Sequence, residues 1–496
     1  MTGKISRRHL LKLGGMTAVI AAGSALASCA PKIVEVTKLV EVEKEKVVEK
    51  EVTKEVEKVV KETVVQEKVV KETVVIDKQA EKAAAMKGKV VWDTFRANPP
   101  WDKDRLDNFK KLYPNVEVEL RMGVADQQAN YAKWYAMEAA GDLGDVVQFD
   151  PSHFHFWRAA DKNILLPIDD LIAADNTNLK EWYEQFVNMS RYKGKIYGLP
   201  SWGWSGYDCL VVNELAIKEL GVEKLPDPTT YSTTWEQILE WIHKSHKASG
   251  DKVDRYGFQW AGGEAGFTVM SRWFGGDLIN AEGTKTIFQD DDKALKGLKT
   301  VYDLVVTEKL TPAPGALGQN VSSEIACAEN RLTMYHCGSL CAVNAQRAVK
   351  DPTKASINVI LFPKREDGKV PSQIRGGAWQ VHRTTKVPEI AYQFVKELTS
   401  KEGCFGFNNF GGNTALVRPD VLPLLRVQIP MYKNFEGNLL NGMVINAPAN
   451  SRGREFTDAI AQNGAKVIDP IKPMPFEQGI KEMAAEIQKI LDMEPA

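Results

Sequence analysis

The chain has 496 residues, of which 44% are hydrophobic and 26% charged, and its net charge at pH 7 is −1. A charge so close to zero gives no support to a nucleic-acid partner. The length exceeds the ~250–300 residues at which a single hydrophobic core stops growing, so more than one folded lobe is expected.

The first 29 residues have the features of an export signal. Arg7 and Arg8 precede a short apolar stretch from Met16 to Leu26, and the arginine pair points to the twin-arginine route. The ending Leu-Ala-Ser-Cys resembles a bacterial lipobox. It implies a signal peptide over residues 1–28 and a lipidated Cys29 that anchors the mature chain on the extracytoplasmic side, in the periplasm or at the cell exterior. The alternative, an uncleaved membrane helix, would be shorter than the roughly 20 apolar residues that a span needs.

Residues 29–85 have a low-complexity composition, almost entirely Val, Lys, Glu and Thr from Pro31 to Lys82. The segment Glu57–Val65 recurs as Glu67–Val75, and no aromatic residue is present to build a core. The near balance of lysine and glutamate favours a solvated tether. A helical oligomerisation stalk is the alternative, although valine pairs spaced by five residues drift around a helix.

After residue 85, predicted strands alternate with predicted helices. Strands are expected at 88–92, 116–120 and 145–149, and helices at 101–113 and 130–140. Strands separated by helices predict an α/β fold with a parallel sheet. In such sheets ligands bind beyond the carboxyl ends of the strands.

Several short motifs follow one another in a fixed order along residues 88–496. They are Gly144–Val147, Ala159–Ile172, Tyr192–Pro200, Val212–Glu214, Thr234–Ile238, Asn330–Met334, Gly376–Trp379 and Ala391–Lys396. In this order they resemble the extracellular solute-binding proteins (family 1, sugar type) of bacterial ABC importers. The resemblance implies a two-lobed periplasmic-binding-protein-like fold with a hinge, a ligand cleft between the lobes, and ABC permease subunits as partners.

The resemblance also implies that each lobe is discontinuous. The first lobe would hold residues 86–200 with 378–435, and the second would hold 201–377 with 436–496. Closure around the ligand would be a hinge motion. Three features depart from the family pattern: the insertion at 227–232, the unusually aromatic stretch at 201–206, and Leu340, which falls near the position of a sugar-stacking tryptophan in the maltose-binding branch. The resemblance therefore does not imply a maltodextrin ligand.

A sugar site needs flat aromatic side chains for stacking and charged or amide groups for hydrogen bonds to hydroxyls. Candidates follow predicted strand ends or lie near the predicted lobe crossing: Arg96, Phe149, Asp150, Trp202, Trp204, Trp260, Trp379 and Arg452. Each has an ordinary alternative. The tryptophans can pack in a core, Asp150 can cap the following helix, and Arg452 can face solvent. Trp92, Trp134, Trp157, Trp235 and Trp241 are expected in the core.

Enzymatic sites are less well supported. The pairs His153/His155 and His243/His246 lack a third ligand at zinc spacing, so we interpret them as surface features and predict no metal site. Asp290–Asp292 precede a predicted helix and favour capping over calcium binding.

No phosphate loop or Gly-x-Ser-x-Gly elbow occurs, and we predict no catalytic residue and no cofactor. The enzymatic alternative is a glycan hydrolase with Asp150 and Asp208 as acid and base.

Cys209, Cys327, Cys337, Cys341 and Cys404 remain after lipidation. Some could pair in an oxidising compartment, but their spacing does not give the connectivity, and their odd number leaves at least one unpaired. A buried free thiol is the default expectation for each. The sequence thus predicts a membrane-tethered receptor that binds a mono- or oligosaccharide and delivers it to an ABC importer. A receptor for a polyol, a glycerol phosphate or a peptide remains the alternative.

Overall fold

The computed structural model describes residues 81–94, 99–124, 126–151, 154–206, 209–250, 252–313, 315–318, 321–404, 417–428, 430–444 and 452–493. The predicted signal peptide, Cys29 and most of the predicted tether lie outside this part of the chain. Among the described residues, no helix has the length and apolar character needed to cross a membrane.

The first sheet has the order β13-β12-β3-β1-β2, with β6 paired to β12. Its early elements are β1 (Gly88–Thr94), α4 (Pro99–Leu112), β2 (Val116–Met122), α5 (Gln127–Ala139) and β3 (Val146–Val147). β1 pairs in parallel with both β2 and β3, which confirms the strand and helix predictions for this stretch. The sheet as a whole is mixed, because β12 (Val370–Val381) is antiparallel to β3 and to β6 (Gly198–Gly206).

The second sheet has the order β11-β7-β10-β9-β8 and is also mixed. Its strands are β7 (Cys209–Asn213), β8 (Lys247–Ser249), β9 (Lys252–Gln259), β10 (Leu332–Cys337) and β11 (Ile357–Leu361). β9 and β10 are parallel, whereas β7 is antiparallel to β10 and β11. The parallel pairing predicted from residues 88–149 is confirmed for β1, β2 and β3, and the antiparallel partners in both sheets come from other parts of the chain. Alternation along the chain does not reveal strands that enter a sheet from a distant segment.

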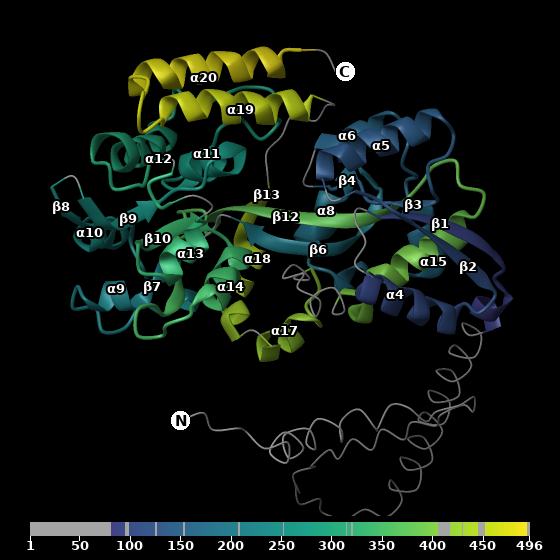
Figure 1. Cartoon of the computed structure of the whole chain (residues 1–496). Coiled ribbons are helices and arrows are strands. Elements are labelled where there is room, and N and C mark those ends of the chain that lie inside the picture. The colour runs from purple at the N-terminus through teal and green to yellow at the C-terminus, as the bar shows by residue number, and fades with distance from the viewer. Residues whose placement is uncertain are drawn as a thin grey trace, which may run out of the picture. The chain divides into compact units, whose positions relative to one another are not determined.

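The paired strands β6 and β12 connect the two halves of the molecule. Figure 1 shows them running together from the half that contains β1 and β2 to the half that contains β7, β9 and β10. Their register shifts between Gly377 and Ala378, a bulge that changes which side chains face the same side of the ribbon. Strand β13 (Gly442–Val444) continues the sheet beside β12.

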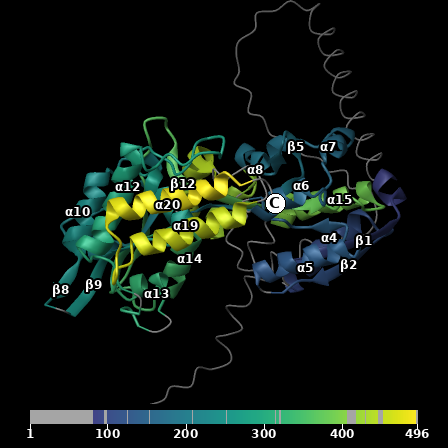
Figure 2. The ribbon, with the colours of Figure 1, turned by 90° about the horizontal axis from the view of Figure 1, so that it is seen from above.

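Helices cover both sheets. They are α6 (Phe154–Asp161), α7 (Asp169–Asp175), α8 (Glu184–Met189), α9 (Glu214–Lys218), α10 (Trp235–Ser245), α11 (Gly263–Arg272), α12 (Asp292–Tyr302), α13 (Ser323–Ala328), α14 (Ser339–Ala348), α15 (Pro388–Leu398), α17 (Leu422–Gln428), α18 (Glu436–Asn441), α19 (Gly453–Val467) and α20 (Phe476–Leu491). Figures 1 and 2 both show α19 and α20 side by side over the half that contains α11 and α12. A short hairpin is formed by β4 (Arg191–Tyr192) and β5 (Lys195–Ile196).

Helix α10 shows how local sequence produces one of these elements. Thr234 and Gln237 form a reciprocal capping box at its start, which satisfies two amides that the first turn leaves unpaired. Trp235 and Trp241 both face the core of the second half, as predicted, and Trp235 stacks on Trp273 at 4.6 Å between ring centroids. Burial of one apolar face is the main source of stability for such a helix.

The cysteines differ in part from the prediction. Cys209, Cys327 and Cys404 are buried, as expected, and burial raises the pKa of the Cys404 thiol to about 12. Cys337 and Cys341 instead form a disulfide with a Cα–Cα distance of 6.1 Å, so the prediction of free thiols is wrong for these two. The turn from β10 into α14 brings the two sulfur atoms together, a proximity that sequence spacing alone did not reveal.

The histidine prediction is also corrected in one place. His155 is buried, with its ring 3.9 Å from that of Tyr131, because α6 packs its first turn against α5. His243 is exposed, as predicted, and pairs with Glu308, while His153 lies outside the described residues. Within the described part of the chain, no group of three potential metal ligands occurs.

The acidic run before α12 acts as a helix cap. Asp291 is the N-cap residue, and its side chain accepts a hydrogen bond from the amide of Lys293 at 2.9 Å. This contact confirms the prediction that capping explains the run.

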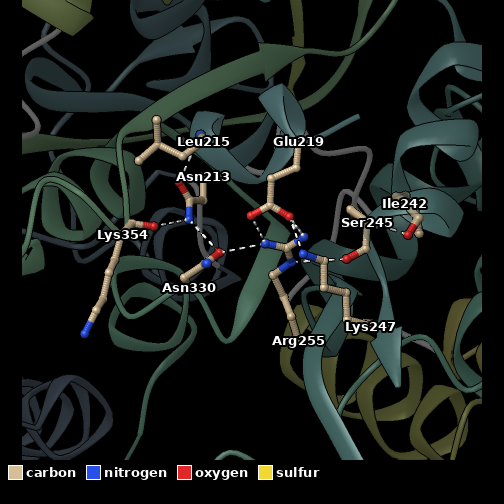
Figure 3. Close-up of polar contacts among 9 residues, drawn as sticks. All are labelled: Asn213, Leu215, Glu219, Ile242, Ser245, Lys247, Arg255, Asn330 and Lys354. Carbon is tan, nitrogen blue, oxygen red and sulfur yellow. Dashed lines mark hydrogen bonds and ion pairs between the residues drawn. The ribbon is translucent and has the colours of Figure 1, made fainter. Parts of the chain in front are cut away.

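A polar network in the second half joins β7, β9 and the turn before β10 (Figure 3). Arg255 is 2% exposed and donates to both carboxylate oxygens of Glu219, at 3.1 and 2.8 Å. It also donates to Asn330 Oδ1 at 3.0 Å, and Asn213 Nδ2 donates to the same oxygen at 2.9 Å. The groups bind one another, so we interpret the network as a structural support of the sheet.

This network predicts a pH dependence of stability. The hydrogen bonds from Arg255, assisted by Lys247 and opposed by burial, lower the pKa of Glu219 to about 2. Since the folded-state pKa lies below the ordinary value of 4.5, the contribution to stability is present above pH 4.5 and is lost as the pH falls towards 2. We expect Glu219→Gln to lose less stability than the wild type between pH 5 and 3, as measured by urea unfolding. The exposed Glu240→Gln is the control, and an unchanged pH dependence in Glu219→Gln would contradict the assignment.

Candidate functional site

Trp202 lies against the backbone of Gly377 where β6 and β12 pair. The two residues are directly opposite each other, and a Cβ added to Gly377 would lie 2.0 Å from Trp202 Nε1. The same Cβ would lie 2.7 Å from Nε2 of Gln148, which follows β3. Because Gly377 has no side chain, the Trp202 indole from β6 and the Gln148 amide after β3 can both lie over β12 at this position. Trp202 remains partly exposed.

A second polar group joins α11 to the same strand. Glu264 is 7% exposed and accepts from Gln373 Nε2 at 2.9 Å and from Arg375 Nη2 at 3.1 Å. Arg375 Nε also donates to Gln373 Oε1 at 2.7 Å, and Thr268 Oγ1 donates to Glu264 at 3.1 Å. These contacts fix the orientation of each group, and oriented groups bind a ligand at lower entropic cost.

Phe149 and Asp150 follow Gln148 at the carboxyl end of β3. The Gln380 side chain forms two hydrogen bonds with the backbone of Phe149. Its Oε1 accepts from the Phe149 N–H at 2.7 Å, and its Nε2 donates to the Phe149 carbonyl oxygen at 2.7 Å. The Phe149 ring is 0% exposed and lies among aromatic side chains, including Tyr131. We therefore assign Phe149 to the core, in contrast to its predicted role in binding. Asp150 is buried, and its amide donates to the Tyr131 hydroxyl at 3.3 Å.

Trp379 is likewise a core residue. It is 3% exposed and makes an edge-to-face contact with Trp92, with 5.3 Å between ring centroids. The residue skipped by the register shift is Ser201 of β6, so β12 itself gains no extra residue between Gly377 and Trp379. The burial of Trp379 favours the core alternative that the sequence also allowed for this residue.

The remaining predicted residues are spread over several elements. Trp260 follows β9, is partly exposed, and packs edge-to-face on Phe267 at 5.4 Å. Arg452 precedes α19 and pairs with Glu455 at 3.6 Å. Trp204 pairs through its backbone with Arg375, but its side chain, like Arg96 and Asp208, lies outside what the structure describes.

Sequence reasoning did not select Gln148, Glu264, Gln373 or Arg375. Gln148 could have been found, because it lies in the last residues of the predicted strand 145–149, next to Phe149. Glu264 carried a weaker signal as an acidic residue in the first turn of a helix after a strand. No sequence signal marked Gln373 or Arg375, because their importance depends on Glu264, a partner more than 100 residues away in the chain.

Comparisons with known proteins agree with this architecture. Residues 104–414 match the model of the family described as "Bacterial extracellular solute-binding protein". An ABC substrate-binding protein from Listeria monocytogenes, solved with cycloalternan, is 16% identical with a TM-score of 0.67, and the match covers 82% of this chain and 100% of that chain. Maltose-bound MalE3 of T. maritima is 20% identical with a TM-score of 0.63, covering 81% and 99%.

A third similar structure has a different kind of ligand. UgpB from Mycobacterium tuberculosis, solved with glycerophosphocholine, is 14% identical with a TM-score of 0.66, and the match covers 82% of this chain and 99% of that one. At these identities the matches show the fold alone, which is the α/β periplasmic-binding-protein fold with two mixed sheets.

Proposed function

Because the chain belongs to the bacterial extracellular solute-binding protein family, whose members are receptors and not enzymes, we propose that it binds a carbohydrate between two lobes and delivers it to an ABC importer. The observation that carries the proposal is the partly exposed indole of Trp202, held over β12 beside the Gln148 amide and near the oriented Glu264 and Arg375 groups. An aromatic face with fixed amide and charged groups suits the apolar face and the hydroxyls of a sugar.

The proposed lobes are those implied by the sequence, residues 86–200 with 378–435 and residues 201–377 with 436–496. The continuous pairing of β6 with β12 supports a hinge at this ribbon, since both strands pass from one half to the other (Figure 1). Ligand contacts with β3 in the first lobe and α11 in the second would favour the closed form, because only a ligand that touches both lobes discriminates between open and closed states.

A phosphate-containing ligand is less well supported by the site. Arg375 is paired with Glu264, so this cluster supplies no uncompensated positive charge for an anion. Relatives of similar fold were solved with cycloalternan, maltose and mannotriose, which favours a neutral sugar. The glycerophosphocholine-bound relative keeps a glycerol phosphodiester as the second candidate.

We also propose that the receptor is tethered outside the cytoplasm. The twin-arginine signal over residues 1–28 and a lipidated Cys29 would anchor it, and the Val/Lys/Glu-rich segment at 29–85 would separate the folded part from the membrane. Incorporation of labelled palmitate that requires Cys29 tests the anchor.

The receptor proposal is tested by ligand-induced stabilisation of the full mature protein. A ligand that binds only the folded state, at a concentration 100 times its Kd, stabilises that state by about 2.7 kcal/mol. We expect a rise in the unfolding midpoint with mono- or oligosaccharides, which should be recovered unaltered. Glycerophosphocholine, a polyol and a tripeptide serve as comparison ligands. A shift with one of these three alone would contradict the carbohydrate proposal and support the alternative.

A further inference from the structure

A cavity of about 510 Å³ lies in the second half of the molecule, beyond the carboxyl end of β9. Four parts of the chain contribute to its wall: the end of β9 with the start of α11, Val305 after α12, the segment that precedes α13, and the end of α19 with the residues after it. Its lining includes Gln259, Trp260, Thr311, Ala313, Asp469 and Ile471. Its volume falls within the range of about 300–1,000 Å³ that is usual for small-molecule sites.

The cavity lies at the edge of the second sheet that meets the crossing ribbon. Gln259 at the end of β9 pairs with Tyr335 of β10, and Cys337 two residues later pairs with Cys209. Cys209 is the first residue of β7 and closely follows β6 in the chain. Gly262 lines the cavity, and Glu264 of the proposed site is two residues farther along. The start of α11 therefore contributes both to the wall of the cavity and to the proposed site.

The wall combines an aromatic ring with polar groups that suit a sugar hydroxyl. The Trp260 indole is partly exposed and is held by its edge-to-face contact with Phe267. Gln259 Oε1 accepts from Ser323 Oγ at 2.9 Å, which orients the amide. Thr311 is 7% exposed, and within the described part of the chain its hydroxyl has no hydrogen-bond partner. A buried hydroxyl without a partner is costly, so a ligand that bonds to it gains free energy.

The charge of the wall favours a neutral occupant. Asp469 accepts from the amides of Ile471 and Lys472 at 2.7 and 3.0 Å, and these backbone hydrogen bonds lower its pKa, so it stays ionised. A carboxylate at the rim repels a phosphate or another anion. The remaining wall is apolar, and Ile471 is 69% exposed.

We propose that this cavity is an additional carbohydrate subsite, which holds one ring of an oligosaccharide whose other rings lie at Trp202. The ring would stack on Trp260, and one of its hydroxyls would bond to Thr311. The inference rests on the proposed function, and it adds that the preferred ligand has three or more sugar units and no anionic group.

Two substitutions test the subsite without touching Trp202 or Glu264. Thr311→Val keeps the side-chain shape and removes the unpartnered hydroxyl, so the ligand-free protein should be as stable as the wild type or more stable. Affinity for trisaccharides should nevertheless fall about three- to tenfold, the effect of one hydrogen bond. Ala313→Trp fills the cavity and should lower trisaccharide affinity more than tenfold. The matched control is Ala248→Trp on exposed β8.

The measurement is calorimetric titration with glucose, maltose, maltotriose and maltotetraose, and with mannose, mannobiose and mannotriose. We expect the wild type to bind trisaccharides more tightly than the corresponding disaccharides, and both variants to lose that difference while their disaccharide affinity stays unchanged. Unaltered trisaccharide affinity in Ala313→Trp would overturn the subsite and leave the receptor function intact. If the wild type binds none of these sugars but is stabilised by a non-sugar solute, both the subsite and the carbohydrate proposal fail.

Discussion

Gly377→Ala is expected to lower carbohydrate affinity about thirtyfold, which corresponds to about 2 kcal/mol, the loss typical of a displaced aromatic anchor. The added Cβ would lie 2.0 Å from Trp202 Nε1, so the indole must leave the surface of β12. Because Trp202 is partly exposed, it can rotate into solvent, and the loss of folding stability should be small. Calorimetric titration with the best sugar from the stabilisation screen measures the effect.

A double-mutant cycle shows whether Gly377 acts through Trp202. Trp202→Ala alone should cause a similar loss of affinity, and Gly377→Ala should add little to it, since both remove the same contact. The neighbouring Gly376 provides a contrast, because its added Cβ would meet the buried Phe186 ring at 2.7 Å. Gly376→Ala should therefore reduce stability more than Gly377→Ala does. Additive losses of affinity in the Gly377/Trp202 double variant would contradict the proposed role of Gly377.

Glu264→Ala is expected to reduce the free energy of unfolding substantially. Removing one member of a buried ion pair costs about 3–5 kcal/mol, and since the Arg375 side chain is 24% exposed we expect about 2–3 kcal/mol here. Arg375, Gln373 and Thr268 would each lose an acceptor. Denaturant unfolding of the ligand-free protein measures the change. An isosteric Glu264→Gln variant should recover part of it.

An exposed pair supplies the control for this substitution. Glu366 is 93% exposed and contacts Lys293 at 3.3 Å, so Glu366→Ala should change stability by less than about 0.5 kcal/mol. If Glu264→Ala proved as mild as Glu366→Ala, the Glu264 cluster would not support the junction of α11 with β12. Its role in orienting groups for the ligand would then lose its basis.

Trp202 and Trp379 illustrate a property that the sequence did not predict, namely which of two candidate tryptophans is buried in the core. Both tryptophans belong to aromatic or glycine-rich motifs near the predicted crossing, and both were equally good candidates. Trp379 packs against Trp92 in the core, whereas Trp202 lies over Gly377 of the paired strand and stays partly exposed. These surroundings arise from the packing and pairing of distant segments, and neither segment encodes them alone.

The sequence by itself determined the local structure and the family of this protein. Strand–helix alternation over residues 88–149, the cap before α12 and the buried face of α10 all follow from short-range periodicity and side-chain chemistry. The tertiary structure decided the mixed pairing of both sheets, the Cys337–Cys341 disulfide and the contact between Glu264 and Arg375, residues 111 positions apart. The physical reason is that a binding site consists of side chains from distant segments, and their neighbours are set by strand register and packing, which only the folded chain defines.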